Sequence, residues 1–138
     1  MSRHLVDPEL FALLDQLPSI ELTLETLDAS RAIFREMALP QEAYARPGVT
    51  IERRVVPGPD GAPDVPVILY RPVGAAGRLP VLLHVHGGGY VIGSAEGSGP
   101  ANVRTADELQ CLVVSVDYRL APETRAPGAA EDAHAVLA

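Results

Sequence analysis

The apolar positions of this chain form two dense runs in its second half and spaced, amphipathic patterns in its first half. Residues 81–85 and 111–116 are short apolar runs rich in valine and leucine. Such runs predict strands buried on both faces, because a half-exposed strand alternates apolar with polar residues. Residues 100–109 between them predict a helix, and a further helix is predicted from Pro127 to Ala138. A strand, a helix and a second apolar strand form a βαβ unit, which implies parallel pairing and a right-handed crossover.

Two amphipathic helices are predicted ahead of the first strand. The first starts at Asp7, which suits an N-cap and precedes a proline, and it ends at Pro18. The apolar positions on its face are Leu10, Leu13, Leu14 and Leu17. The second helix spans about residues 26–37 and closes at Pro40. Its apolar positions are Leu27, Ile33, Phe34 and Met37. The pattern leaves open whether this segment, residues 1–45, packs on the domain or forms part of a lid.

Residues 50–56 and 65–70 each predict a strand, from alternating or β-branched apolar positions. The link between them is rich in proline and glycine, so the two strands are expected to pair as an antiparallel hairpin. Proline cannot donate a hydrogen bond to a neighbouring strand, so Pro63 and Pro66 are expected at a sheet edge.

The first apolar run stops abruptly in His86, Gly87, Gly88 and Gly89. Glycines have no Cβ, so their amides can approach a ligand closely and suit negative charge, either a phosphate or the oxyanion of an acyl-transfer intermediate. A dinucleotide fingerprint needs a third glycine where Ile92 stands, and a phosphate loop needs a lysine, which this chain lacks. The oxyanion interpretation and a tight turn without chemistry remain open at this point.

Composition narrows the class of protein and its partners. The 138 residues suit one domain, and 47% hydrophobic residues suffice for a core. The net charge is −7, and all 11 basic residues are arginine with no larger cluster than Arg53-Arg54, so no nucleic acid partner is expected. The single cysteine, Cys111, is expected to be buried and inert. No window resembles a signal peptide or a membrane span, so a cytoplasmic protein that contacts no membrane is expected.

Three blocks of sequence, in this order and spacing, closely resemble the hormone-sensitive-lipase-like esterases of the α/β-hydrolase superfamily. They are residues 86–94 (HGGGYVIGS), 113–123 (VVSVDYRLAPE) and 130–133 (AEDA). The resemblance implies an α/β fold in which residues 46–138 form the N-terminal part of an α/β-hydrolase domain. Residues 1–45 resemble that family's cap segment.

The same resemblance implies roles for individual residues. Gly87, Gly88 and Gly89 would form the oxyanion hole, with the amides of Gly88 and Gly89 as donors and a third donor from the residue after the nucleophile. His86 would brace the loop. The other residues of this supporting network would be Tyr90, Asp117, Tyr118, Arg119 and Glu123.

Two other groups of polar residues suggest different chemistry. His84 and His86 point to the same face of a strand, but no further ligand follows at zinc spacing, so neither a metal nor another cofactor is expected. Glu131, Asp132 and His134 lie on a predicted helix, where solvated or structural roles are expected.

The nucleophile motif Gly-x-Ser-x-Gly is absent, because none of the serines has glycine at both positions. By the resemblance, the catalytic serine, acid and histidine follow beyond Ala138. We therefore expect an N-terminal fragment of a serine carboxylesterase that acts on small, short-acyl esters through an acyl-enzyme. The fragment alone is expected to be inactive, and the last strand of its sheet is expected to be an unpaired edge. A homodimer of the full-length protein stays open. The alternatives are a non-catalytic α/β-hydrolase relative that binds a small ligand or partner chain, and a nucleotide-binding βαβ protein.

Overall fold

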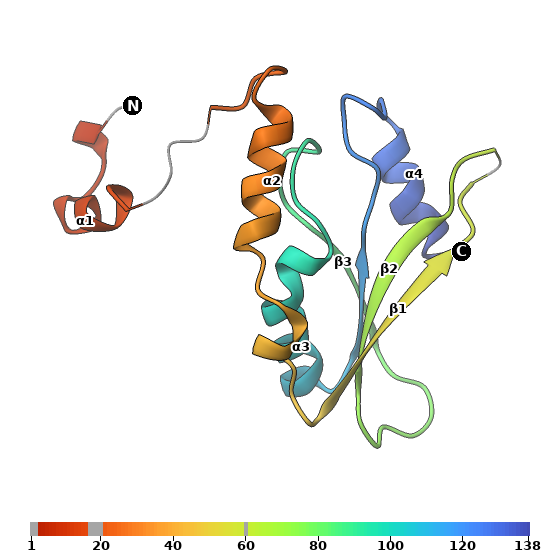
Figure 1. The fold of residues 1–138 in the computed structure, drawn as a ribbon. Helices are drawn as coiled ribbons and strands as arrows, with labels where there is room; N and C mark the ends of the chain where they lie inside the picture. Colours follow the sequence, from red (N-terminus) through yellow and green to blue (C-terminus); the bar gives the residue numbers. More distant parts are fainter. Residues whose placement is uncertain (1–2, 17–20, 60) are drawn as a thin grey trace.

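The computed structural model describes residues 3–16, 21–59 and 61–138, and within them one mixed sheet carries helices on both faces (Figure 1). The strands are β1 (Val49–Val56), β2 (Val65–Pro72), β3 (Val81–Val85) and β4 (Leu112–Val116). The helices are α1 (Phe11–Leu14), α2 (Leu27–Met37), α3 (Gly99–Leu109) and α4 (Gly128–Ala135). Short 3₁₀ turns lie at Arg3–Leu5, Pro8–Leu10, Gln41–Ala43 and Glu96–Ser98.

The four strands follow the order β1-β2-β4-β3. β1 and β2 pair antiparallel from Val49 opposite Pro72 to Val56 opposite Val65, which confirms the predicted hairpin. β3 and β4 pair in parallel and α3 connects them, which confirms the βαβ unit. β4 also pairs antiparallel with β2, so the parallel unit and the hairpin share one sheet.

The burial of the two apolar runs differs from the prediction. Val113 and Val116 on β4 are fully buried, as expected of a strand with neighbours on both sides. On β3, however, Val81 is 61% and Val85 is 47% exposed, so the prediction of burial on both faces is wrong there. β4 inserts between β2 and β3, and within the described residues β3 pairs with β4 alone. The edge strands are therefore β1 and β3, and the last strand, which was predicted to be an unpaired edge, is interior.

Pro66 lies on an interior strand, so its predicted place at a sheet edge is wrong. The ladder between β2 and β4 begins one residue later, where Val67 faces Val116. The missing N–H of the proline therefore costs no bond to β4, while its carbonyl oxygen still accepts from the amide of Asp117 at 3.0 Å. Pro63 precedes the strand.

Side chains alternate between two apolar clusters on opposite faces of the sheet. The α3 side buries Val49, Ile68, Tyr70, Ala95, Val103, Ala106, Cys111 and Val113. Cys111 is therefore a core residue, as predicted. The α4 side buries Val65, Val116 and Tyr118 against partly buried residues of α4 and its surroundings. α4 ends at Ala135, two residues short of Leu137, which the prediction had included.

The two N-terminal helices attach to the domain very differently. Asp7 accepts from the amide of Glu9 at 3.0 Å, which confirms the predicted N-cap, but the helical segment that follows keeps its leucines exposed and stands apart from the sheet (Figure 1). Leu17 and Pro18 lie outside the described residues. α2 forms where predicted, yet Ile33 and Met37 are exposed while Leu27 and Ser30 are buried. The buried face of α2 thus includes Leu27 from the predicted apolar stripe, with Phe34 half-buried, but not Ile33 or Met37.

A buried ion pair fastens α4 to the chain that follows β4. Asp132 is 1% exposed, and its carboxylate accepts from the backbone amide and the Nε of Arg119, each at 2.9 Å. These contacts satisfy the carboxylate with both a charge and a backbone donor, so α4 and the segment after β4 behave as one unit.

Replacing Asp132→Ala should lower the free energy of unfolding by about 2–3 kcal/mol, somewhat less than the ~3–5 kcal/mol typical of a broken buried pair, because Arg119 keeps some contact with solvent. Glu131→Ala is the matched control. Its carboxylate is exposed and lies 4.0 Å from Arg119, so the loss should stay below about 0.5 kcal/mol. Urea midpoints measure both, and equal losses would contradict this account.

Candidate functional site

The carboxyl ends of β3 and β4 bring two loops together, because the strands are parallel and leave the sheet at the same edge. The glycine loop, residues 86–94, follows β3, and residues 117–123 follow β4. The candidate site lies where these loops meet, and α2 lies alongside them (Figure 1).

The path of the glycine loop requires glycine at specific positions. Gly88 has φ +131° and Gly93 has φ +98°, both in a region that side chains disfavour. A Cβ at Gly88 would lie 2.0 Å from the carbonyl oxygen of Ile92, and one at Gly93 would lie 2.5 Å from that of Gly87. Tyr90 also has a positive φ of 65°, which is uncommon for a residue with a side chain.

Hydrogen bonds within the loop hold the carbonyl oxygens of two glycines. The Nδ1 of His86 lies 2.9 Å from the carbonyl oxygen of Gly87, and because a carbonyl only accepts, Nδ1 carries the proton. The carbonyl oxygen of Gly88 accepts from the amides of Val91 and Ile92, each at 3.1 Å. Both carbonyls are therefore turned inward.

Hydrogen bonds from the 117–123 segment hold the loop at two further points. The hydroxyl of Tyr118 donates to the carbonyl oxygen of His86 at 2.8 Å, and the amide of Ala121 donates to that of Tyr90 at 2.8 Å. The rings of His86 and Tyr118 also stack, with centroids 4.1 Å apart. Burial, aided by nearby Tyr90 and Asp117, raises the pKa of Tyr118, so its hydroxyl keeps the proton that it donates.

These held carbonyls determine where the glycine amides point. The loop peptides are trans, so each carbonyl and the N–H of the next residue point in opposite directions. With the carbonyls of Gly87 and Gly88 turned inward, the N–H groups of Gly88 and Gly89 turn outward. No group in the described part of the chain accepts a hydrogen bond from either amide. The loop thus presents two fixed, uncommitted donors.

The remaining charged residues of the predicted network have polar partners within the fold. Asp117 accepts from the amide of Ala95 at 2.9 Å, and Arg119 pairs with Asp132. Glu123 pairs with Arg31, whose hydrogen bonds lower the pKa of the Glu123 carboxyl to about 2. The structure therefore brings Tyr118 to the glycine loop directly and Glu123 to it through Arg31, while it directs Arg119 to α4. The catalytic roles of these residues stay predictions.

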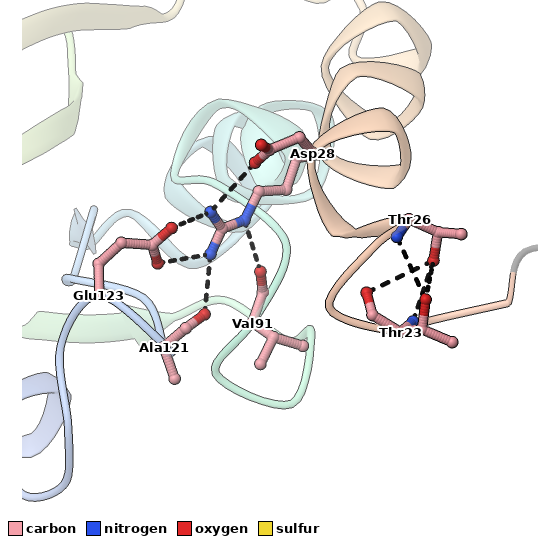
Figure 2. Close-up of polar contacts among 7 residues, drawn as sticks. Thr23, Thr26, Asp28, Val91, Ala121 and Glu123 are labelled. Atoms are coloured by element: carbon pink, nitrogen blue, oxygen red, sulfur yellow. Dashed lines mark hydrogen bonds and ion pairs between the residues drawn. The ribbon is translucent and has the colours of Figure 1, made fainter.

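The sequence analysis missed Arg31 on α2, whose guanidinium group is drawn in Figure 2 between the labelled residues Glu123, Ala121 and Val91. Its Nε donates to the carbonyl oxygen of Val91 at 2.9 Å, and its Nη2 donates to that of Ala121 at 2.8 Å. The helical spacing could have indicated this role, because Arg31 follows the buried Leu27 by four residues and therefore lies on the same face of the helix.

Other candidate groups have structural partners. The Nδ1 of His84 lies 3.2 Å from the hydroxyl of Ser115, but Ser115 is 0% exposed and cannot meet a substrate. Burial, and then the charge of His86, lowers the pKa of His84. Across residues 3–16, 21–59 and 61–138 no three His, Cys, Asp or Glu side chains gather as a metal site would require. The Nε2 of His86 is buried and has no partner among those same residues.

Two cavities lie beside the loops. The larger, about 890 Å³, lies between α2 and the 117–124 segment and includes Gly93 and Tyr118 in its wall. The smaller, about 260 Å³, is mainly apolar and reaches the glycine loop at Val91. Neither wall includes Gly88 or Gly89, and Gly89 is exposed. Gly88 is half-buried, so of the two donor residues only Gly89 is well exposed.

Comparisons with known proteins agree on one family. Residues 82–138 match a family model described as the alpha/beta hydrolase fold. Carboxylesterase NlhH of Mycobacterium tuberculosis is 38% identical over 99% of this chain and 42% of its own length. Esterase LipI of the same organism is 32% identical over 94% of this chain and 40% of its own.

Solved structures give the same result. A structure titled "Bacterial Heroin Esterase" superposes with a TM-score of 0.83 at 41% identity, covering 96% of this chain and 41% of that one. An esterase from Pyrobaculum calidifontis superposes with a TM-score of 0.77 at 35% identity, covering 95% and 41%. The chain spans about two fifths of the length of these relatives. None of the helices in the described residues has the length and apolar character needed to cross a membrane.

The contact between Arg31 and Glu123 predicts a specific acid dependence. Glu123 has a pKa of about 2 in the folded chain, against ~4.3 for an unfolded glutamate. A lowered pKa contributes stability that is complete above about pH 4.3 and is lost as the pH falls towards 2. The urea midpoints of the unmodified chain and Glu123→Gln should therefore converge over this window. In an Arg31→Gln background the same substitution should show no such convergence, and a constant difference in the unmodified background would contradict the assignment.

Proposed function

Because this chain belongs to the alpha/beta hydrolase fold family that includes the hormone-sensitive-lipase-like esterases, we propose that it supplies the oxyanion hole of a serine carboxylesterase. The substrates would be small, short-acyl esters, cleaved through an acyl-enzyme. Residues 1–45 would form the cap segment and residues 46–138 the N-terminal part of the hydrolase domain. The catalytic serine, acid and histidine would lie in the portion of the full-length protein that follows Ala138.

The outward amides of Gly88 and Gly89 carry this proposal. When a serine hydroxyl attacks an ester carbonyl, the carbonyl oxygen becomes negatively charged in the tetrahedral intermediate. Donors fixed in advance stabilise this charge without having to reorganise, and removing one donor typically costs ~100- to 1000-fold in kcat. A third donor would come from the residue after the nucleophile.

The neighbouring residues would keep these donors fixed through repeated turnovers. His86 would hold the carbonyl of Gly87, and Tyr118 would hold that of His86, by the hydrogen bonds of 2.9 Å and 2.8 Å described above. Gly87 would line the hole without a side chain to obstruct the ester. Since these partners act on carbonyls, their contribution would be to orientation rather than to proton transfer.

The proposal is tested with the full-length protein and p-nitrophenyl butyrate. We expect hydrolysis that a fluorophosphonate probe abolishes by labelling one serine beyond residue 138. The 138-residue chain alone should show no turnover, because donors without a nucleophile and base do not support the acyl-enzyme route. Titratable turnover by the purified 138-residue chain would refute this placement of the serine. Absence of hydrolysis and of labelling in the full-length protein would favour a non-catalytic relative.

Gly88→Ala in the full-length protein should lower kcat by ~100-fold or more, since the added Cβ would displace the loop and misdirect an oxyanion donor. The comparison is Gly74→Ala in the link between β2 and β3, where φ is also positive at +75° but no described atom lies within 4 Å of the added Cβ, so the strain arises away from the site and the fall in kcat should be much smaller. Circular dichroism and melting temperature verify that both variants fold. Equal values of kcat in the two folded variants would contradict the proposal.

A further inference from the structure

Arg31 connects α2 to both loops of the candidate site through one guanidinium group. Its side chain is 13% exposed, and besides the carbonyls of Val91 and Ala121 it contacts both carboxylate oxygens of Glu123, at 2.7 and 2.9 Å (Figure 2). Glu123 neutralises its charge, so the effect of Arg31 on the loop is geometric rather than electrostatic.

The bond from Arg31 to Val91 leads to an oxyanion donor in two steps. The carbonyl of Val91 belongs to the same peptide as the N–H of Ile92, and that N–H donates to the carbonyl oxygen of Gly88 at 3.1 Å. The carbonyl of Gly88 in turn belongs to the same peptide as the N–H of Gly89. Because each peptide is a rigid plane, fixing one end fixes the direction of the other.

We propose that Arg31 is a positioning residue for the oxyanion hole, which orients the Gly89 amide through the 91–92 and 88–89 peptides. This inference rests on the proposed esterase function. Arg31 does not contact the ester or the reacting atoms. Arg31 fixes the 91–92 peptide, which in turn fixes the 88–89 peptide whose N–H would meet the transition state. Loss of Arg31 should therefore lower kcat while leaving ground-state binding of the ester largely unchanged.

The shape of the side chain suits this role. The Nε donates to the carbonyl of Val91, and Nη2 donates both to the carbonyl of Ala121 and to one carboxylate oxygen of Glu123. Nη1 donates to the other carboxylate oxygen, so all three nitrogens of one planar fork are used. A lysine carries a single ammonium on a flexible stem and cannot meet three acceptors in one plane. The amide of Ala121 also donates to the carbonyl of Tyr90 at 2.8 Å, so the same clamp fixes both loops together.

The test compares Arg31→Gln, Arg31→Lys and two controls in the full-length protein. Steady-state kinetics on p-nitrophenyl butyrate give kcat and KM, and a trifluoromethyl ketone of matching chain length reports binding of a transition-state mimic. We expect Arg31→Gln to lower kcat by about 10- to 100-fold, less than the ~100- to 1000-fold cost of removing a donor. KM should stay within about twofold, and affinity for the ketone should fall in parallel with kcat/KM. Arg31→Lys should recover part of the melting temperature but little of kcat.

The controls separate positioning from general stability. Arg104→Gln changes an exposed arginine on α3 that has no side-chain partner in the described part of the chain and lines neither cavity, and it should retain the kcat of the unmodified protein. Val103→Ala opens a cavity in the α3 core and should lower the melting temperature without lowering kcat at a temperature where the protein is folded.

Several outcomes would overturn the inference. If the Arg31→Gln variant folds and its kcat is unchanged, or only its KM is raised, then Arg31 does not orient the Gly89 amide. A fall in kcat that Val103→Ala reproduces at an equal loss of melting temperature would reduce Arg31 to a structural residue. If the unmodified full-length protein hydrolyses no ester, the proposed function fails, and the role assigned to Arg31 fails with it.

Discussion

A trans peptide cannot direct its carbonyl oxygen and its N–H to the same side, and the candidate site depends on this constraint. His86, Val91 and Ile92 donate to the carbonyls of Gly87 and Gly88, so the amides of Gly88 and Gly89 are left pointing outward. The two amides therefore stay free to donate because the carbonyl oxygens of the same peptides are already hydrogen-bonded within the loop. This requires glycine at residue 88, because a side chain there would collide with the loop.

The fold supplies the groups that hold these carbonyls. The parallel pairing of β3 and β4 places the glycine loop beside the 117–123 segment, from which Tyr118 and Ala121 donate to the loop. The pair between Arg119 and Asp132 attaches that segment to α4, and Arg31 attaches it to α2. Elements from both ends of the chain thus converge on one loop, which explains why its conformation is fixed although much of it lies near the surface.

Local sequence patterns predict the individual strands and helices well, but they predict less well which of these elements lie side by side. The hairpin, the βαβ unit and the Asp7 cap follow from local patterns and are confirmed. The burial of β3 and the interior position of Pro66 were misjudged, because sheet order depends on which strands pair at long range and local periodicity does not report it. Arg31 was missed for a related reason, since an arginine on an amphipathic helix is usually solvated unless the fold brings acceptors to it.

The central claim is that the amides of Gly88 and Gly89 are free donors aimed at a developing oxyanion. The most direct measurement is the NMR spectrum of the full-length protein labelled with ¹⁵N-glycine, with and without a bound trifluoromethyl ketone whose adduct carries that charge. The account predicts that the amide protons of these two glycines move downfield when the adduct forms. Unchanged shifts at both glycines, in a protein that has formed the adduct, would contradict it.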